Sequence, residues 1–261
     1  MTVAIIGSGK MGSGFARLLA SKGIDVAVGN KNPDKAVALA KEIGAQVKGG
    51  SVRDAVRQAD IILLAVKYED AAEALKAAGD LTNKAVVDIS NPITADFKGL
   101  TIGHSTSAAE EIQKLVPGAK IVKAFNTIFA ELLPTESRKG RKVQVFIAGD
   151  DATAKAKVSD LVKATEFEPV DSGTLYNARF LEPMGEMNIL LGFFLGWGTS
   201  GAPEYRKASS PPSIPHQVAW RHLQAWLTLA ALAFQMRHVA TSRGIVENCR
   251  SSTGVFEGVP R

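Results

Sequence analysis

The chain has 261 residues, of which 46% are hydrophobic and 22% charged, and this composition excludes intrinsic disorder as its main state. Its single cysteine excludes an intramolecular disulfide and a thiolate cluster for zinc, so stability has to come from a packed core. The net charge is +5, of which residues 1–207 carry only +2, so the main part lacks the concentrated basic face of a nucleic-acid-binding protein.

The chain opens on a strand sequence with no secretory leader ahead of it, and we therefore expect a cytoplasmic protein. From there, apolar stretches of strand length alternate with stretches at helical spacing. This alternation predicts an α/β fold of the Rossmann type, with a doubly wound, mainly parallel sheet and helices on both faces. The predicted strands span residues 2–7, 25–30, 45–48, 61–66, 84–89, 120–125, 143–148 and 168–171.

Three of the predicted helices have clear sequence signals. Apolar residues recur at i, i+4, i+7 and i+8 in segments 11–19 and 154–162, which predicts amphipathic helices there. Ser107 and Glu110 have the spacing of a capping box, which predicts that a helix begins at this point. The basic segment 138–142 has no such signal and is predicted to be a solvated loop.

The alternation ends after the eighth strand, and three parts are predicted. Residues 1–174 form the Rossmann domain, 175–207 a C-terminal helical element, and 208–261 an atypical tail that is either a docking helix, a marginally ordered extension or an appended segment. Residues 178–197 are apolar on all sides, which predicts a buried helix that is either the wall of an acceptor pocket or a dimer contact. Neither this acid-containing stretch nor the 14-residue apolar run 223–236 suits a membrane span, so we expect no membrane association.

A glycine-rich turn follows the first strand and opens a helix, in the pattern G-x-G-x-x-G. In dinucleotide-binding proteins the first glycine allows the tight turn, the second admits the pyrophosphate, and the third lets helix and strand pack closely. The helix N-terminus adds amide donors for the phosphates. The predicted cofactor contacts in this turn are Gly7, Ser8, Gly9, Lys10, Met11 and Gly12.

The end of the second strand predicts which dinucleotide is bound. A cofactor with a free ribose 2′-hydroxyl would meet an Asp or Glu there, and segment 29–33 contains neither. Amide and ammonium groups suit a 2′-phosphate instead, so we expect NADP(H). The predicted contacts are Asn30, Lys31, Asn32 and Lys35.

Turns of polar or aromatic character follow three further strands, at the sheet edge where ligands of a parallel sheet bind. They are predicted to line the adenine, ribose and nicotinamide of the cofactor, through Val66, Lys67, Ser90, Asn91, Pro92, Phe125, Asn126 and Thr127. His104 is a candidate proton donor. No residue stands out as a certain catalytic group, and we find neither a metal-ligand pattern nor a Ser-His-Asp pattern.

Four segments, 7–12, 29–36, 122–127 and 181–184, resemble the family of NADPH-dependent reductases of the deazaflavin coenzyme F420, whose relatives include the oxidoreductase domain of STEAP metalloreductases. The resemblance implies NADPH in the Rossmann half, with its nicotinamide near Ser90–Pro92 and Ala124–Thr127. It also implies a homodimer, and hydride transfer to a flavin or deazaflavin. We expect that small-molecule acceptor to lie between Asn126–Thr127 and the 178–197 helix.

Two other functions are compatible with these motifs. A β-hydroxyacid dehydrogenase or imine reductase should carry a catalytic Lys or Asp on the long C-terminal helix, and residues 178–197 contain neither. An NADPH-binding regulatory protein without turnover would share the cofactor motifs. Sustained NADPH oxidation would exclude this second alternative.

Overall fold

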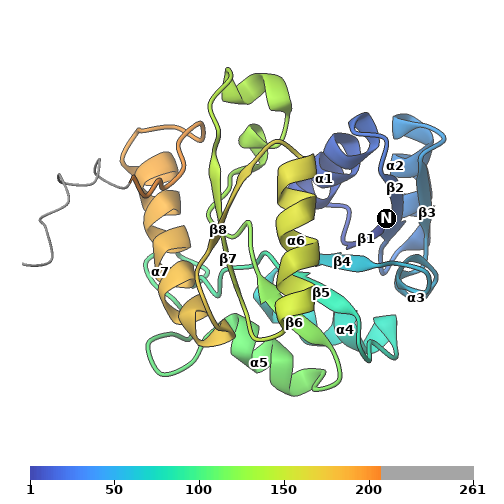
Figure 1. Cartoon of the computed structure of the whole chain (residues 1–261), viewed down its shortest axis with the longest axis horizontal. Helices are drawn as coiled ribbons and strands as arrows, with labels where there is room; N and C mark the ends of the chain where they lie inside the picture. The colour runs from blue at the N-terminus through green and yellow to red at the C-terminus, as the bar shows by residue number, and fades with distance from the viewer. Residues whose placement is uncertain (207–261) are drawn as a thin grey trace, which may run out of the picture. The chain divides into compact units, whose positions relative to one another are not determined.

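The computed structural model describes residues 1–206, and the predicted tail 208–261 lies outside the described residues. One eight-stranded sheet runs through the described part in the order β3-β2-β1-β4-β5-β6-β7-β8 (Figure 1). All eight predicted strands are present, with ends that differ by a few residues. They are β1 (Thr2–Ile6), β2 (Asp25–Gly29), β3 (Val47–Gly50), β4 (Ile61–Leu64), β5 (Ala85–Asp88), β6 (Lys120–Lys123), β7 (Gln144–Gly149) and β8 (Glu168–Asp171).

The sheet is parallel except at one pair, which confirms the predicted doubly wound fold. Strands β1, β4, β5 and β6 pair in parallel, and strand β7 runs antiparallel to β6, with Lys123 opposite Ala148. The reversal follows from the long connection 124–143, which contains the short 3-10 turns η2 (Ala130–Leu132) and η3 (Thr135–Arg138) in place of a crossover helix. The central strands are buried on both faces, which explains their Val- and Ile-rich sequences.

Helices cover both faces of the sheet. Helices α1, α2 and α6 pack on one face with the Phe15 cluster, and α3, α4 and α5 pack on the other with Leu75 and Ile112. The predicted helices 11–19 and 154–162 are confirmed as parts of α1 and α6. The bounds are α1 (Lys10–Ser21), α2 (Pro33–Ile43), α3 (Val52–Val56), α4 (Ala71–Ala78), α5 (Ala108–Leu115) and α6 (Ala152–Ala164).

The predicted start of α5 is confirmed, with Ser107 as its N-cap. The Ser107 hydroxyl accepts from the Glu110 backbone N–H at 3.2 Å and donates to the Glu110 carboxylate at 2.8 Å. Two first-turn backbone donors nearby, on Ala108 and Ala109, bind the side chain of Glu182, which is far along the chain.

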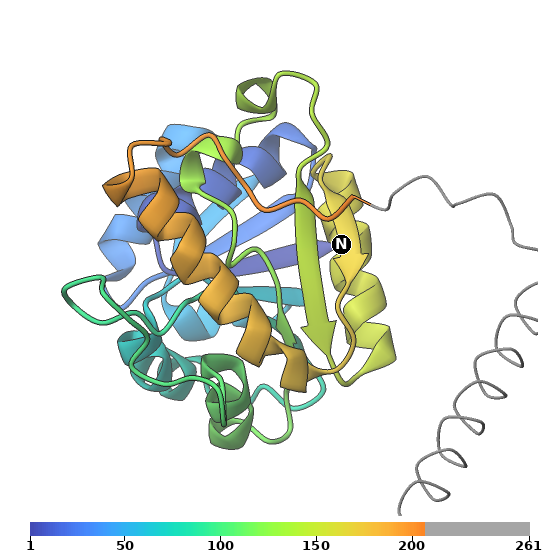
Figure 2. The same cartoon turned by 90° about the vertical axis from the view of Figure 1, so that its left-hand side faces the viewer.

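Helix α7 (Ala178–Ile189) continues into a π-helical turn, Leu190–Phe194, and contacts α5 (Figure 2). The expectation of a helix buried on all sides is wrong, because only its inner face packs on the sheet. On its outer face Phe180 is 62% exposed, and Trp197, which follows the helix, is 74% exposed. Among residues 1–206, no helix is both long enough and apolar enough to cross a bilayer.

The basic segment 138–142 is only partly a solvated loop. Arg138 is 2% exposed, and its guanidinium lies 4.0 Å from the centre of the Phe167 ring. The remaining residues of the segment are exposed as predicted. Stacking on an aromatic ring compensates for part of the desolvation of the arginine, an arrangement that charge patterning alone does not reveal.

Candidate functional site

The carboxyl ends of β1, β2 and β4 surround a cavity of about 420 Å³, which we call the β1–β2 cavity. Most residues predicted to bind the phosphate, adenine and ribose groups are together here. Two acidic residues from the start of α4, Asp70 and Glu73, were not anticipated. The predicted residues that line the cavity are Gly7, Ser8, Gly9, Asn30, Lys31, Lys35, Val66 and Lys67.

The three motif glycines have separate structural roles. Gly7 has a φ of +106°, and a Cβ there would lie 2.4 Å from the carbonyl oxygen of Ala65. A Cβ on Gly12 would lie 2.1 Å from the carbonyl oxygen of Gly7, so this glycine allows helix α1 to approach the turn. Gly9 has no protein atom within 4 Å of an added Cβ, so its open side is free for a ligand.

The other residues of the motif do not line the β1–β2 cavity. Lys10 forms an exposed ion pair with Glu131, which ties the start of α1 to the η2 turn. Met11 packs against the apolar core. Their predicted contacts with a phosphate through backbone amides stay predictions.

At the end of β2, hydrogen bonds fix the positions of the polar side chains. The Asn30 side-chain amide donates to the Ser8 hydroxyl at 2.8 Å, and its oxygen accepts from the Asn32 backbone N–H at 2.9 Å. Asn32 is the N-cap of α2, because its side chain accepts from the Asp34 backbone N–H, and it does not line the cavity. Lys31 lines the cavity, and segment 29–33, in which it lies, contains no acidic residue.

The turns after β5 and β6 meet in a reciprocal pair of side-chain amides. The Asn91 Nδ2 atom donates to the Asn126 carbonyl oxygen at 2.8 Å, and the Asn126 Nδ2 atom donates to the Asn91 Oδ1 atom at 2.9 Å. Asn126 also donates to the carbonyl oxygen of Leu181 in α7 at 2.7 Å, while its own Oδ1 atom is buried without a partner. We call Asn91 and Asn126 the amide pair. It connects two predicted nicotinamide turns directly.

Two residues predicted to contact the cofactor, Ala124 and Phe125, have their side chains in the core instead. Phe125 is 1% exposed and packs edge-on against Phe15 and Phe167. Its φ of 60° is unfavourable for a bulky residue, and the surrounding rings hold it there. This sharp turn places Asn126 and Thr127 at the end of β6.

Helix α7 lies directly on this turn. The Asn188 side chain donates to the Thr127 carbonyl oxygen at 3.0 Å, and a Cβ on Gly185 would lie 2.6 Å from the Asn91 side chain. The expectation that a planar ring lies between Asn126–Thr127 and the helix is therefore wrong for residues 181–188, because these contacts leave no gap. Gly192 approaches the Phe129 ring in the same way.

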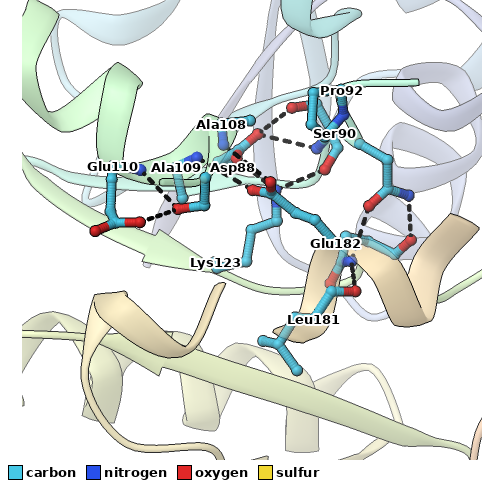
Figure 3. Close-up of polar contacts among 12 residues, drawn as sticks. Asp88, Ser90, Pro92, Ala108, Ala109, Glu110, Lys123, Leu181 and Glu182 are labelled. Carbon is cyan, nitrogen blue, oxygen red and sulfur yellow. Dashed lines mark hydrogen bonds and ion pairs between the residues drawn. The ribbon is translucent and has the colours of Figure 1, made fainter. Parts of the chain in front are cut away.

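Three charged side chains that sequence reasoning did not select are buried together where β5, β6 and α7 meet, and Figure 3 shows them pointing toward one another. The Lys123 Nζ atom lies 2.7 Å from the Asp88 Oδ2 atom and 2.8 Å from the Glu182 Oε1 atom, and none of the three side chains is more than 1% exposed. We call them the buried charge cluster. Burial alone would lower the pKa of Lys123, but the two carboxylates outweigh it and hold that pKa above its usual range.

The cluster has further partners in α5 and in the turn after β5. The Glu182 carboxylate accepts from the backbone N–H groups of Ala108 and Ala109 at 2.9 and 3.2 Å, which are the donors left at the start of α5. Asp88 accepts from the hydroxyl and backbone N–H of Ser90 at 2.7 and 2.9 Å. A lysine and an acid in otherwise apolar strands, and a glutamate in an apolar helix, are the sequence signals that could have found this cluster.

The remaining candidates lie apart from the β1–β2 cavity. His104 is exposed, has a φ of 57°, and lines a separate open cleft with Pro183 and Glu186. Its predicted part in proton donation stays a prediction. Within residues 1–206 no group of His, Cys, Asp or Glu side chains has a geometry suited to a metal ion.

An ion pair beside the buried charge cluster should make stability pH-dependent. Arg179 of α7 makes a bidentate contact with Glu110 of α5 at 2.7 and 2.8 Å, and hydrogen bonds from Arg179 hold the pKa of Glu110 below its usual range. Since the folded pKa is lowered, this stabilisation is present above about pH 4.3 and is lost as the pH falls through the folded value. In urea unfolding, Arg179→Gln should cost about 1 kcal/mol at pH 7 and less at pH 3. Lys163→Gln, which removes an exposed pair with Asp160 on α6, is the control. An equal loss at both pH values would contradict this assignment.

Comparison with known proteins shows which proteins the chain is similar to. A model of the NADP oxidoreductases described as coenzyme F420-dependent matches residues 2–92. The F420-dependent NADP reductase of Methanocaldococcus jannaschii is 26% identical over 217 residues, which cover 77% of this chain and 96% of that protein. The chain is thus similar to the F420-dependent NADP oxidoreductases, and the family model matches about its first third. The chain also resembles a solved structure from Arthrobacter sp. FB24, which is provisionally named an F420-dependent NADP reductase. The two are 29% identical, with a TM-score of 0.70, and the match covers 79% of this chain and all of the other.

The chain also resembles part of a larger protein. Metalloreductase STEAP3 of Rattus norvegicus is 36% identical over 180 residues, which are 69% of this chain and 35% of the metalloreductase. The chain therefore spans about a third of the length of the STEAP relatives that it matches.

Proposed function

We propose that the chain binds NADP(H) at the β1–β2 cavity and transfers hydride between the nicotinamide and a flavin or deazaflavin acceptor. The observation that supports this most is the combination in one cavity of a glycine with a free side, Gly9, and two lysines, Lys31 and Lys35. The free side admits a pyrophosphate, and the lysines suit the doubly charged 2′-phosphate that distinguishes NADP from NAD.

The residues present fit a reaction that works by positioning. When bound, NADPH supplies the hydride, and transfer to a stacked ring requires distance, orientation and exclusion of water more than an acid or base. The chain's part is to hold the Asn126–Thr127 turn rigidly, which it does through the amide pair and Asn188. Since α7 fills the space beside this turn, we place the acceptor on the outer side of the nicotinamide, away from residues 181–188.

The test is cofactor preference. Lys31→Glu should weaken NADPH binding about tenfold or more, because a charge-assisted contact of about 1.5–3 kcal/mol is replaced by repulsion. NADH affinity should change little. Lys41→Glu changes the same charge at the other end of α2, away from the cavity, and is the control. Equal wild-type affinities for NADPH and NADH, measured by calorimetry, would overturn the cavity assignment.

A second measurement tests turnover. NADPH oxidation is followed with FMN, FAD, riboflavin, a deazaflavin, Fe(III) chelates and quinones as acceptors. Sustained oxidation with a flavin or deazaflavin supports the reductase. Tight NADPH binding without oxidation by any acceptor would favour a regulatory protein that binds the cofactor without turnover.

We also propose that the chain forms a homodimer through the exposed apolar face at α7. This face is formed by Phe180, Met187, Phe193, Phe194 and Trp197, each more than half exposed. An apolar face of this kind is typical of a protein contact. Trp197→Ser should weaken dimerisation by about 2 kcal/mol or more, whereas Leu115→Ser on exposed α5 should not. A monomeric wild type in light scattering would rule this proposal out.

A further inference from the structure

The buried charge cluster lies where four elements meet. Asp88 ends β5, Lys123 ends β6, and Glu182 comes from α7 and reaches the start of α5 (Figure 3). Lys123 also donates to the carbonyl oxygen of Ser90 at 2.6 Å, in the residue directly before Asn91. The ammonium group of Lys123 thus links its own strand, β6, to β5, to the turn after β5 and to helix α7.

The electrostatics of the cluster are balanced by the backbone. Two carboxylates and one ammonium leave a net negative charge in a region without access to water, which is unfavourable unless other groups compensate. The amides of Ala108 and Ala109 supply that compensation at the positive end of α5. Every member is therefore satisfied, and shifting α7 along the sheet would leave both Lys123 and these amides without the Glu182 carboxylate.

The cluster and the amide pair are linked through the same short segments. Ser90 is held by Asp88 and Lys123, and the next residue, Asn91, belongs to the amide pair. Glu182 is next to Leu181, whose carbonyl oxygen accepts from Asn126. Asn91 thus directly follows a residue that Lys123 contacts, and Asn126 is hydrogen-bonded to the residue before Glu182, which Lys123 also contacts.

We propose that Lys123 and Glu182 are positioning residues for hydride transfer, which fix α7 and the Ser90–Asn91 turn so that the amide pair holds the nicotinamide in one geometry. This inference rests on the proposed NADP(H) function. Three apolar side chains of similar volume would fill the same space as the buried charge cluster. They would not form hydrogen bonds with the Ser90 carbonyl or with the backbone amides of α5.

The experiment uses two variants that keep the volume of the cluster. Glu182→Gln retains the shape and one acceptor for α5 while weakening the contact with Lys123. The triple variant Asp88→Asn, Lys123→Met, Glu182→Gln carries no buried charge and guards against a folding defect in the single variant. Lys120→Met, on the exposed start of the same strand, is the matched control.

Four quantities are measured below the melting temperature of each variant. They are the affinity for 2′,5′-ADP, which carries the 2′-phosphate but no nicotinamide, the maximal rate and deuterium isotope effect with NADPH labelled at C4, and amide hydrogen exchange of segments 90–92 and 124–128 without ligand. In both cluster variants we expect unchanged 2′,5′-ADP affinity, faster exchange in both segments, a kcat about 10- to 100-fold lower and a larger isotope effect. A merely structural role would lower the active fraction and leave the isotope effect unchanged.

The failures of the two proposals can be told apart. If the wild type oxidises NADPH and the cluster variants show wild-type kcat, isotope effect and exchange, the positioning role is overturned while the NADP(H) function stands. If the wild type binds neither NADPH nor 2′,5′-ADP, the proposed function fails. If it binds them without oxidising NADPH, unchanged exchange in the variants overturns the positioning role, and faster exchange confined to the two segments supports it.

Discussion

Lys123→Met is expected to lower the free energy of unfolding by about 3–5 kcal/mol, because it leaves Asp88 and Glu182 buried with no cation between them. Urea denaturation followed by circular dichroism at pH 7 measures this loss. Lys155→Met is a suitable control, since it removes an ion pair with the exposed carboxylate of Asp171. Its effect should stay near the 1 kcal/mol or less that is typical of surface pairs.

The neutral triple variant of the buried charge cluster should recover most of that loss. Removing all the charges removes the desolvation penalty together with the attraction, and uncharged replacements of buried ion pairs are often neutral in stability. The expected order of stability is therefore wild type and triple variant close together, with Lys123→Met well below both. If the triple variant were as unstable as the single one, packing and not charge would be the main contribution of Lys123.

Gly9→Ala and Gly12→Ala are expected to have opposite effects. An alanine at position 9 meets no protein atom and has an allowed φ of −71°, so stability should change by less than about 1 kcal/mol. The methyl group projects from a cavity-lining residue, and NADPH affinity should fall about tenfold or more because it blocks the approach of the pyrophosphate to the backbone.

Gly12→Ala should instead lower the stability of the fold. Its methyl group would lie 2.1 Å from the Gly7 carbonyl oxygen, so α1 has to move away from the turn, at a cost of about 1–3 kcal/mol. Thermal unfolding with and without NADPH separates the two effects. A Gly9→Ala protein that NADPH stabilises as much as the wild type would show that the pyrophosphate does not approach this glycine.

Much of the fold could be predicted because its signals are local. The β1–α1 turn needs glycines at fixed spacing, and the buried parallel strands need unbroken apolar runs, so both are visible in the sequence. The cavity residues at the ends of β1, β2 and β4 follow from the rule that ligands bind at the carboxyl edge of a parallel sheet.

The parts that could not be predicted depend on contacts between distant residues. Glu182 looks like a misplaced acid in an apolar helix until α5 and Lys123 are brought beside it, 74 and 59 positions earlier in the chain. Phe125 looks like a site aromatic because it follows a strand, and only the positive φ turns its ring toward the core. Spacing along one segment carries no information on either arrangement.

The two rings packed against Phe125 tie the backbone of the Asn126–Thr127 turn to the packing of the core. The ring of Phe125 lies 5.0 Å from that of Phe15 and 5.9 Å from that of Phe167, and these neighbours hold the residue in a backbone conformation that it would otherwise avoid. A smaller side chain at position 15 or 167 would let residue 125 relax and would move the adjoining Asn126, without touching any ligand. A substitution deep in the core, well away from the β1–β2 cavity, would thus displace a residue of the amide pair.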